Sequence, residues 1–191
     1  MPPKAKFTRE EVINVAFDIV EQDGMDALTA RSLAQKLGSS PRPIFTVFDN
    51  MEEVQREVIA SANKLYGSYV EAGLEEEMPF KGVGKAYIRF AAEKSKLFQL
   101  LFMSEQSQIP GMNSVLGIIE GSYDKILNSI VQGYGFDKQT ATGFYLHLWI
   151  YSHGIASLIA TKVCAFTAEE IESMLAEVGG SIVRKIKAEG K

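Results

Sequence analysis

A long stretch without charged residues constrains the fold of this chain more than any other feature. Between Lys138 and Lys162 there is no Asp, Glu, Lys or Arg, and large apolar residues point in every direction around a helix drawn through the stretch. A membrane span is a poor explanation, because both histidines of the chain and several serines, threonines and tyrosines fall inside it. Burial on all sides of a helical bundle explains such a helix better.

Complete burial of this helix predicts a second copy of the chain. The 191 residues, 46% of them hydrophobic and 23% charged, suffice for one sizeable core or for a small domain joined to a larger one. They do not readily cover a C-terminal hairpin of helices at 137–161 and 167–188. We therefore expect a homodimer in which the last two helices of each subunit form a four-helix interface.

Helical periodicity extends through the remaining sequence, without a strand-period segment, internal repeat or low-complexity tract. The predicted fold class is all-α, with a three-helix, helix-turn-helix domain at 1–50 that a long helix joins to a helical bundle at 51–191. The predicted helices are 9–23, 30–37, 41–48, 51–72, 80–94, 95–103, 113–132, 137–161 and 167–188.

Capping residues define most of the predicted helix starts. Thr8 is expected to accept a hydrogen bond from the amide of Glu11, and the Glu11 carboxylate is expected to accept one from the amide of Thr8. The other expected N-caps are Thr29, Ser40, Asn50 (with Glu53) and Thr167 (with Glu170).

The second and third helices form a helix-turn-helix pattern, because only the tight turn Gly38-Ser39 separates them. Pro41 and Pro43 fall in the first turn of the third helix. Amides in a first turn have no acceptor within the helix, so proline loses no hydrogen bond there. We therefore expect the third helix to form despite its prolines, with Ile44, Phe45 and Phe48 inward.

Residues 7–54 resemble the DNA-binding domain of the tetracycline-repressor (TetR) family of regulators. The features that carry this resemblance are Asp23-Gly24, Leu28-Thr29, Leu33-Ala34, Leu37-Gly38, the Phe45 and Phe48 pair and the acidic start of the fourth helix. Trp149 followed by His153-Gly154 resembles the C-terminal domain of the Trp-His-Gly branch of that family. The resemblance implies a homodimeric transcriptional repressor that binds a double-stranded DNA operator and is released by a small-molecule effector.

The resemblance also implies which residues contact DNA. Thr29 and Arg31 are expected at phosphates, and the outward positions of the third helix are expected in the major groove, where Arg42 is the strongest reader of guanine. Lys4 and Lys6, with Arg9, extend the basic surface as an N-terminal arm. The candidate DNA-binding residues are Lys4, Lys6, Thr29, Arg31, Ser40, Pro41, Arg42, Phe45 and Thr46.

The charge distribution favours DNA binding only locally. The chain carries a net charge of −4, but from Ala27 to Phe48 it has three cations and no acid. Phe45, Val47 and Met51 stand where the family often has tyrosine, histidine and lysine. Each replacement removes a usual backbone anchor, so we expect weaker electrostatic anchoring and a shallower salt dependence.

Large apolar side chains in the C-terminal part predict an aromatic and apolar ligand cavity with few polar groups. The effector is accordingly expected to be a small apolar or aromatic molecule, with His147 and Tyr151 as the polar groups that orient it. The candidate ligand-binding residues are Phe90, Phe98, Phe102, Met103, Tyr123, Phe144, His147 and Tyr151.

Other functional classes find little support in the residues. A single cysteine, Cys164, excludes an intramolecular disulfide and a cysteine-based zinc site, and it fits a reducing compartment. There is no catalytic constellation or glycine-rich phosphate loop, so we expect no enzyme, no metal and no cofactor. Without a signal-peptide layout the expected location is cytoplasmic. The alternative is a helical ligand-binding or scaffold dimer that has lost specific DNA binding.

Overall fold

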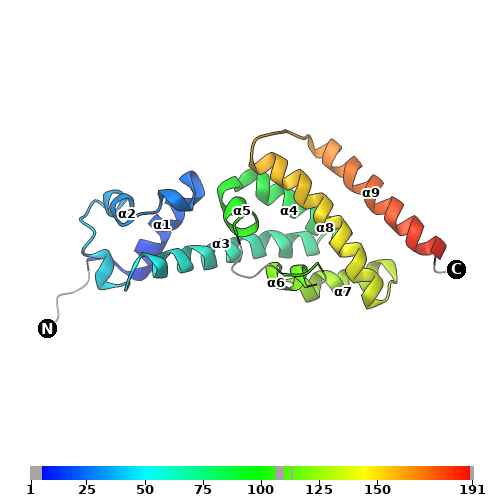
Figure 1. Ribbon diagram of the computed structural model, residues 1–191, viewed down its shortest axis with the longest axis horizontal. Coiled ribbons are helices and arrows are strands. Elements are labelled where there is room, and N and C mark those ends of the chain that lie inside the picture. The colour runs from blue at the N-terminus through cyan, green and yellow to red at the C-terminus, as the bar shows by residue number, and fades with distance from the viewer. Residues whose placement is uncertain (1–5, 106–109, 113, 190–191) are drawn as a thin grey trace. The chain divides into compact units, whose positions relative to one another are not determined.

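A computed structural model describes residues 6–105, 110–112 and 114–189, and within these residues the chain forms helices and no strand (Figure 1). The predicted all-α fold class is confirmed. None of the described helices is both long enough and apolar enough to span a membrane. The elements are α1 (Arg9–Asp23), η1 (Met25–Ala27), α2 (Ala30–Lys36), η2 (Ile44–Thr46), α3 (Met51–Leu74), α4 (Pro79–Glu93), α5 (Ser95–Phe102), α6 (Val115–Ile119), α7 (Tyr123–Tyr134), α8 (Lys138–Ala160) and α9 (Ala168–Glu189), where η marks a 3₁₀ helix.

The chain divides into two compact units. The first unit combines Met1–Leu65 with Lys94–Ser104, and the second combines Tyr66–Glu93 with Glu105–Lys191. Helix α3 therefore contributes to both units, and α5 joins the first unit although it follows α4 in the sequence. The division differs from the predicted boundary after residue 50, and the roles of the two parts stay predictions.

The N-terminal helices of the first unit begin as their caps predict. Thr8 and Glu11 form the reciprocal capping box at α1. Thr29 caps α2 through the amide of Ser32, whose hydroxyl accepts from the Thr29 amide in return. Gly38 then takes a left-handed φ of +61°, which glycine adopts without steric cost and which ends the helix.

The predicted third helix over 41–48 is wrong. Only the three-residue 3₁₀ helix η2 forms, because the amides of Ile44, Thr46 and Val47 each donate to the carbonyl three residues back. The ring of Pro43 also disfavours the helical conformation at the residue before it, Arg42. The Thr46 hydroxyl also donates to Pro43 O at 2.6 Å. Ile44 and Phe48 are buried as expected, whereas Phe45 is 42% exposed and not inward.

The start of α3 follows its predicted cap with one change. The amide of Glu53 donates to Asn50 Oδ1 at 2.9 Å, as expected. The carboxylate of Glu53, however, accepts from the amide of Asp49 at 2.7 Å, one residue before the N-cap. The first turn of α3 is therefore tied to the chain that leaves η2.

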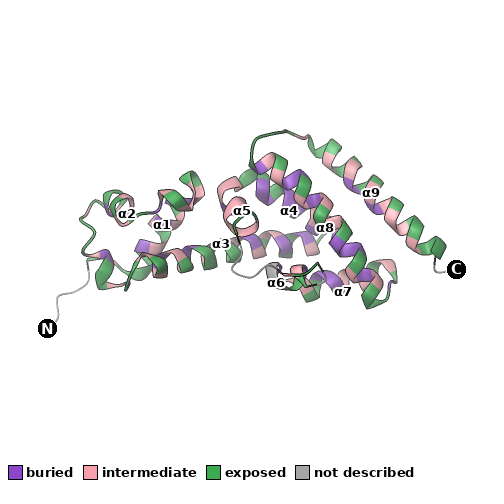
Figure 2. Ribbon diagram, viewed as in Figure 1, coloured by how far each residue is buried: buried purple, intermediate pink, exposed green. Residues whose placement is uncertain are grey.

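In the second unit, α4 packs along α8 and contacts α7, while α9 lies against α8 and α4. Figure 2 shows buried residues on the facing sides of α4 and α8, and mostly exposed or intermediate residues along α9. The end of α3 crosses α4 closely, since a Cβ added to Gly82 would lie 2.1 Å from Gly73 O. Only glycine at both positions permits this approach.

The single helix predicted over 113–132 is interrupted. Helix α6 ends at Ile119 and α7 begins at Tyr123, so Glu120, Gly121 and Ser122 form a break. The break brings Glu120 into the interior, where it is 5% exposed. Helices α8 and α9 form as predicted, with Asp137 as the N-cap of α8 and the Thr167–Glu170 capping box at α9.

Candidate nucleic-acid interface and ligand cavity

The first unit presents its predicted DNA-binding residues on its surface. All eight that the structure describes are exposed: Lys6, Thr29, Arg31, Ser40, Pro41, Arg42, Phe45 and Thr46. Lys4 lies outside the described residues. Arg31 and Arg42 make no hydrogen bond or ion pair with any described residue, so both guanidinium groups are available to a partner. Lys6 Nζ donates to Ser39 Oγ at 3.1 Å, which holds the start of the described chain beside the turn after α2.

Arg9 has a structural role rather than the predicted role of an arm. Its guanidinium donates to Glu53 Oε1 at 2.7 Å, to Glu57 Oε1 at 2.9 Å and to Val47 O at 2.9 Å. It also stacks over the ring of Phe48, 4.2 Å from the centroid. These contacts join α1 to the segment around η2 and to the start of α3.

The electrostatics of this cluster follow from its geometry. The hydrogen bond from the Asp49 amide, with the Arg9 guanidinium as the second cause, lowers the pKa of Glu53. The hydrogen bond to Glu53 raises the pKa of Arg9 further. Both groups therefore stay charged at neutral pH, and Arg9 holds η2 in place for the exposed side chains around it.

The second unit contains a cavity of about 320 Å³ that the sequence did not locate. Five helices contribute to it, and its walls are mainly aromatic. The lining residues are Tyr66 (α3), Met78, Phe80, Lys81, Val83, Gly84 and Tyr87 (α4 and its approach), Glu120, Tyr134 (α7), Phe144, Tyr145, Leu148, Trp149 and Ser152 (α8), and Leu175, Ala176, Gly179, Gly180 and Val183 (α9). The volume falls in the range of about 300–1,000 Å³ that is typical of small-molecule sites.

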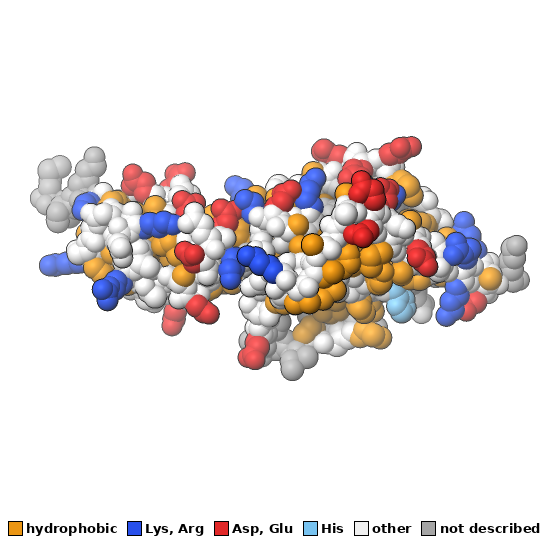
Figure 3. Space-filling model, turned by 90° about the horizontal axis from the view of Figure 1, so that it is seen from above, with side chains coloured by type: hydrophobic (Ala, Val, Ile, Leu, Met, Phe, Trp, Pro, Cys, Tyr) orange, Lys and Arg blue, Asp and Glu red, His pale blue; other side chains and the backbone are white. Residues whose placement is uncertain are grey.

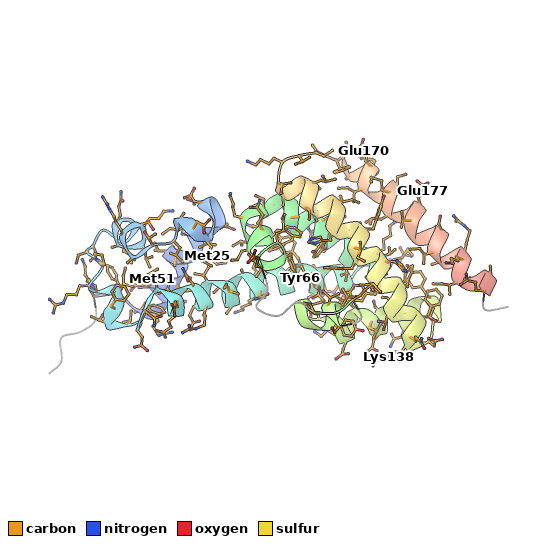
Figure 4. The ribbon with its side chains drawn as sticks, viewed as in Figure 1. Met25, Met51, Tyr66, Lys138, Glu170 and Glu177 are labelled. Carbon is orange, nitrogen blue, oxygen red and sulfur yellow. The ribbon has the colours of Figure 1, made fainter. Side chains whose placement is uncertain are left out.

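The aromatic walls are held by ring–ring contacts. Phe80 lies 5.4 Å from Phe144 and 5.5 Å from Tyr145, measured between ring centroids. Tyr66 meets Tyr87 edge-on at 6.0 Å. Figure 4 shows Tyr66 on the part of α3 that lies beneath α4 and α8. Such contacts fix the orientations of the rings that line the cavity.

A carboxyl group interrupts the aromatic lining. Glu120 Oε2 accepts a hydrogen bond from Tyr66 Oη at 2.7 Å, and Oε1 accepts from the Ser122 amide at 3.3 Å. Burial raises the pKa of Glu120, and the hydrogen bond from Tyr66 opposes that rise. Burial, with the neighbouring Glu120 charge, raises the pKa of Tyr66 and of Tyr87 far above the ordinary value.

His153 lies next to the cavity wall. Its Nδ1 is 2.9 Å from Tyr87 Oη, and its ring stacks on Trp149 with centroids 5.3 Å apart. Burial lowers the pKa of His153. The histidine of the Trp-His-Gly pattern is therefore a support for two cavity residues.

The predicted ligand-binding residues lie mostly away from this cavity. Phe144 lines it, and the other seven are not among the lining residues. Phe90 is buried against Tyr66 and Tyr69, and Tyr123 lines a separate pocket with Leu116 and Leu146. Phe98, Phe102 and Met103 belong to the first unit, His147 is exposed on α8, and Tyr151 is half-buried.

Sequence reasoning missed most of the lining, Glu120 above all. One signal for it was present, because Gly121 directly follows Glu120 in a predicted helix and favours a break at that point. The remaining lining residues follow helical core spacing and carry no mark that separates a cavity wall from a packed core.

The outer face of α8 is apolar and uncovered in the single chain. Ile150 is 51% exposed and Leu158 39%, and Val163 just beyond the helix is 71% exposed. Gly154 lies between them on the same face, and an added Cβ there would meet nothing within 4 Å. Figure 3 shows apolar side chains gathered on the side of the second unit where α8 and α9 lie.

Comparisons with known proteins agree with this architecture. The sequence model of the family "Tetracyclin repressor-like, C-terminal domain" matches residues 80–178. The chain therefore belongs to the TetR family of transcriptional regulators. Among curated proteins no sequence matches the chain.

Two solved structures share the fold over almost the whole length. The fatty acid degradation regulator FadR from Bacillus halodurans has 16% identity and a TM-score of 0.54, with 91% of this chain and 93% of that chain covered. A protein assigned to the TetR-family transcriptional regulators, from Mesorhizobium loti MAFF303099, has 19% identity and a TM-score of 0.52, with 92% and 94% covered. At these identities the likeness concerns the fold alone.

Proposed function

We propose that this TetR-family regulator is a homodimeric repressor that binds operator DNA through its first unit and leaves it when a small molecule enters the cavity of its second unit. The observation that carries the proposal is the exposed, unpaired pair Arg31 and Arg42 on a segment without acids. Arg9 positions that segment from behind, which leaves Arg42, Ser40 and Thr46 facing outward. No catalytic role is proposed, because the proteins of this family are regulators.

Dimerisation through α8 and α9 is part of the proposal. The exposed stripe of Ile150, Gly154 and Leu158 supports it, because a contiguous apolar helix face is stabilised when a second copy covers it. A two-fold dimer also repeats the recognition segment, as two half-sites about 34 Å apart require.

Release by a ligand follows from linkage. Effector and operator need only favour different states of the dimer, and each then weakens the binding of the other by the same factor. Helix α3 has residues in both units, and its first turn is tied to η2 through Asp49 and Glu53. It is therefore the element that we expect to transmit a change between the cavity and the recognition segment. A cytoplasmic location is part of the proposal, because a regulator that binds operator DNA acts where the DNA is and because the free thiol of Cys164 fits a reducing compartment.

The test begins with a binding selection from genomic fragments at moderate salt, followed by quantitative binding of the selected operator. Arg42→Ala should weaken operator binding by about 1–3 kcal/mol and relax specificity at one base position. Arg56→Ala on α3 is the matched control, since it removes the same exposed charge away from the recognition segment. If no fragment is enriched, or if Arg42→Ala and Arg56→Ala behave alike, the chain is better described as a helical ligand-binding or scaffold dimer.

A further inference from the structure

The cavity of the second unit combines aromatic walls with a buried carboxyl group, and this combination favours a ligand with a positive charge. We infer that the effector is an organic cation, an amine or quaternary ammonium group carried on an apolar or aromatic body, with the cationic group seated against Glu120. This inference rests on the proposed function, since it names the chemical class of the effector.

Glu120 has bonding capacity that the described residues do not use. An ionised carboxylate offers about four lone-pair positions. Two are used in the described residues, by the Tyr66 hydroxyl and the Ser122 amide. Glu120 is only 5% exposed, yet no ion pair among the described residues involves it. A buried charge without a counter-charge is unfavourable, so a cation brought by a ligand would supply what the fold lacks.

The cavity residues around Glu120 are mainly aromatic. The electrostatic influence of Glu120 reaches Tyr66, Tyr87 and Tyr145, which come from three different helices. With Trp149 they line the same cavity. Aromatic faces attract a cation electrostatically, most strongly when it has left water. Aromatic rings and a carboxylate therefore act together on the same ligand charge, whereas a neutral apolar ligand would use the rings alone.

A negatively charged ligand would find no free cation among the lining residues. Lys81 is the one lysine or arginine among the lining residues, and its ammonium group is paired with the carboxylate of Glu172. An acidic ligand would have to compete with Glu172 for Lys81 while its own charge entered a cavity that holds Glu120. Like charges at short range in a poorly solvated site repel, so the cavity disfavours ligands that carry a carboxylate.

The test uses three probes with one biphenyl body: biphenylmethyl-trimethylammonium, its neutral isostere with carbon in place of nitrogen, and biphenylacetate. Binding is followed by the fluorescence of Trp149, which is the one tryptophan of the chain and lines the cavity. We expect the cation to bind about 10- to 100-fold more tightly than the neutral isostere, through charge pairing with Glu120 and contact with the aromatic faces, and the anion to bind weakest.

Two matched variants locate the effect. Glu120→Gln keeps the shape and an acceptor for Tyr66 but removes the charge, so it should reduce the preference for the cation to the part that the rings supply and leave the neutral probe unchanged. Glu93→Gln is the control, because Glu93 also accepts a tyrosine hydroxyl, from Tyr69 at 2.6 Å, yet does not line the cavity. It should change none of the three affinities.

Several results would overturn the inference. These are a preference of the unmodified protein for biphenylacetate, equal binding of cation and isostere, and a Glu120→Gln variant that keeps the cation preference undiminished. The comparison of probes needs no variant, so it decides the question even if Glu120→Gln does not fold. Operator release separates this inference from the proposed function: if biphenylacetate alone releases operator, a ligand-released repressor stands and the cationic effector falls. If the cation binds through Glu120 but leaves operator affinity unchanged, the cation site stands and release falls.

Discussion

The two units of this protein differ in what they expose and what they bury. In the first unit Arg31 and Arg42 are exposed and unpaired, and the apolar residues beside them, Ile44 and Phe48, are buried. In the second unit the carboxyl group of Glu120 is buried, while Ile150 and Leu158 are exposed on α8. The difference indicates two kinds of partner. Exposed cations suit a solvated polyanion, whereas a buried charge among rings suits one small ligand and an apolar face suits a second copy of the chain.

The largest effect is expected from breaking the apolar face. Ile150→Glu places a charge in the proposed interface. We expect the dissociation constant of the dimer to rise by about 100-fold or more and the affinity for operator DNA to fall with it. Sedimentation equilibrium measures the first and operator titration the second. Ile59→Glu is the matched control, because Ile59 is an exposed isoleucine of the first unit, at 37%. A dimer that survives Ile150→Glu unchanged would place the interface elsewhere.

The next effect concerns the packing that encloses the cavity. Gly82→Ala puts a methyl group 2.1 Å from Gly73 O, a backbone atom that cannot move aside as a side chain does. We expect a loss of about 3 kcal/mol in the free energy of unfolding, at the upper end of overpacking effects. Chemical denaturation measures it.

Gly67→Ala supplies the control for that substitution on α3. Nothing lies within 4 Å of a Cβ added at Gly67. Alanine is the better helix former, so this variant should gain stability, by up to about 1 kcal/mol. Equal effects at the two glycines would show that the α3–α4 crossing yields more easily than its geometry indicates.

These expectations show how unevenly the sequence predicts the two units. Starts of helices were predictable because a cap such as Thr8 or Thr167 acts within one turn. The prediction of a helix over 41–48 was also based on a local rule, and it was wrong. A first-turn proline costs no hydrogen bond, but Pro43 restricts the backbone of Arg42 before it, and only η2 forms. The exposure of Arg42 was correctly expected, since it depends on little beyond its own segment.

The cavity was not predictable in the same way. Tyr66, Phe144 and Trp149 have the spacing of ordinary core residues, and their shared lining depends on how five helices pack. The sequence predicted Glu120 as an ordinary polar residue within a single helix. In the structure the helix is broken at Gly121, and Glu120 faces the interior. Phe98 was expected near a ligand, but α5 belongs to the first unit, which neighbouring sequence does not reveal.

A smaller effect should separate Arg9 from the exposed cations of the same unit. Arg9→Met keeps an apolar stem over Phe48 but removes the donors to Val47, Glu53 and Glu57. We expect a lower melting temperature and a moderate loss of operator affinity, with an unchanged slope of affinity against salt concentration. Arg56→Met is the control. A shallower salt slope with an unchanged melting temperature would instead make Arg9 a direct DNA contact, as the sequence alone suggested.

The smallest effect should come from the buried charge itself, without any ligand. Burial raises the pKa of Glu120 in the folded chain, so between its unfolded and folded pKa values the native state binds more protons than the unfolded state. Stability from this group is therefore greatest at low pH and falls as pH rises through the folded pKa. Glu120→Gln removes that dependence, so at pH 7 the variant should melt no lower than the unmodified protein, and any advantage should vanish as pH falls toward about 4, near the ordinary pKa of a glutamate. Melting temperatures of both proteins across this range measure it. A variant that is less stable at pH 7 and recovers at low pH would mean that the carboxylate stabilises the fold, and the contrast between exposed cations and a strained buried anion would then fail.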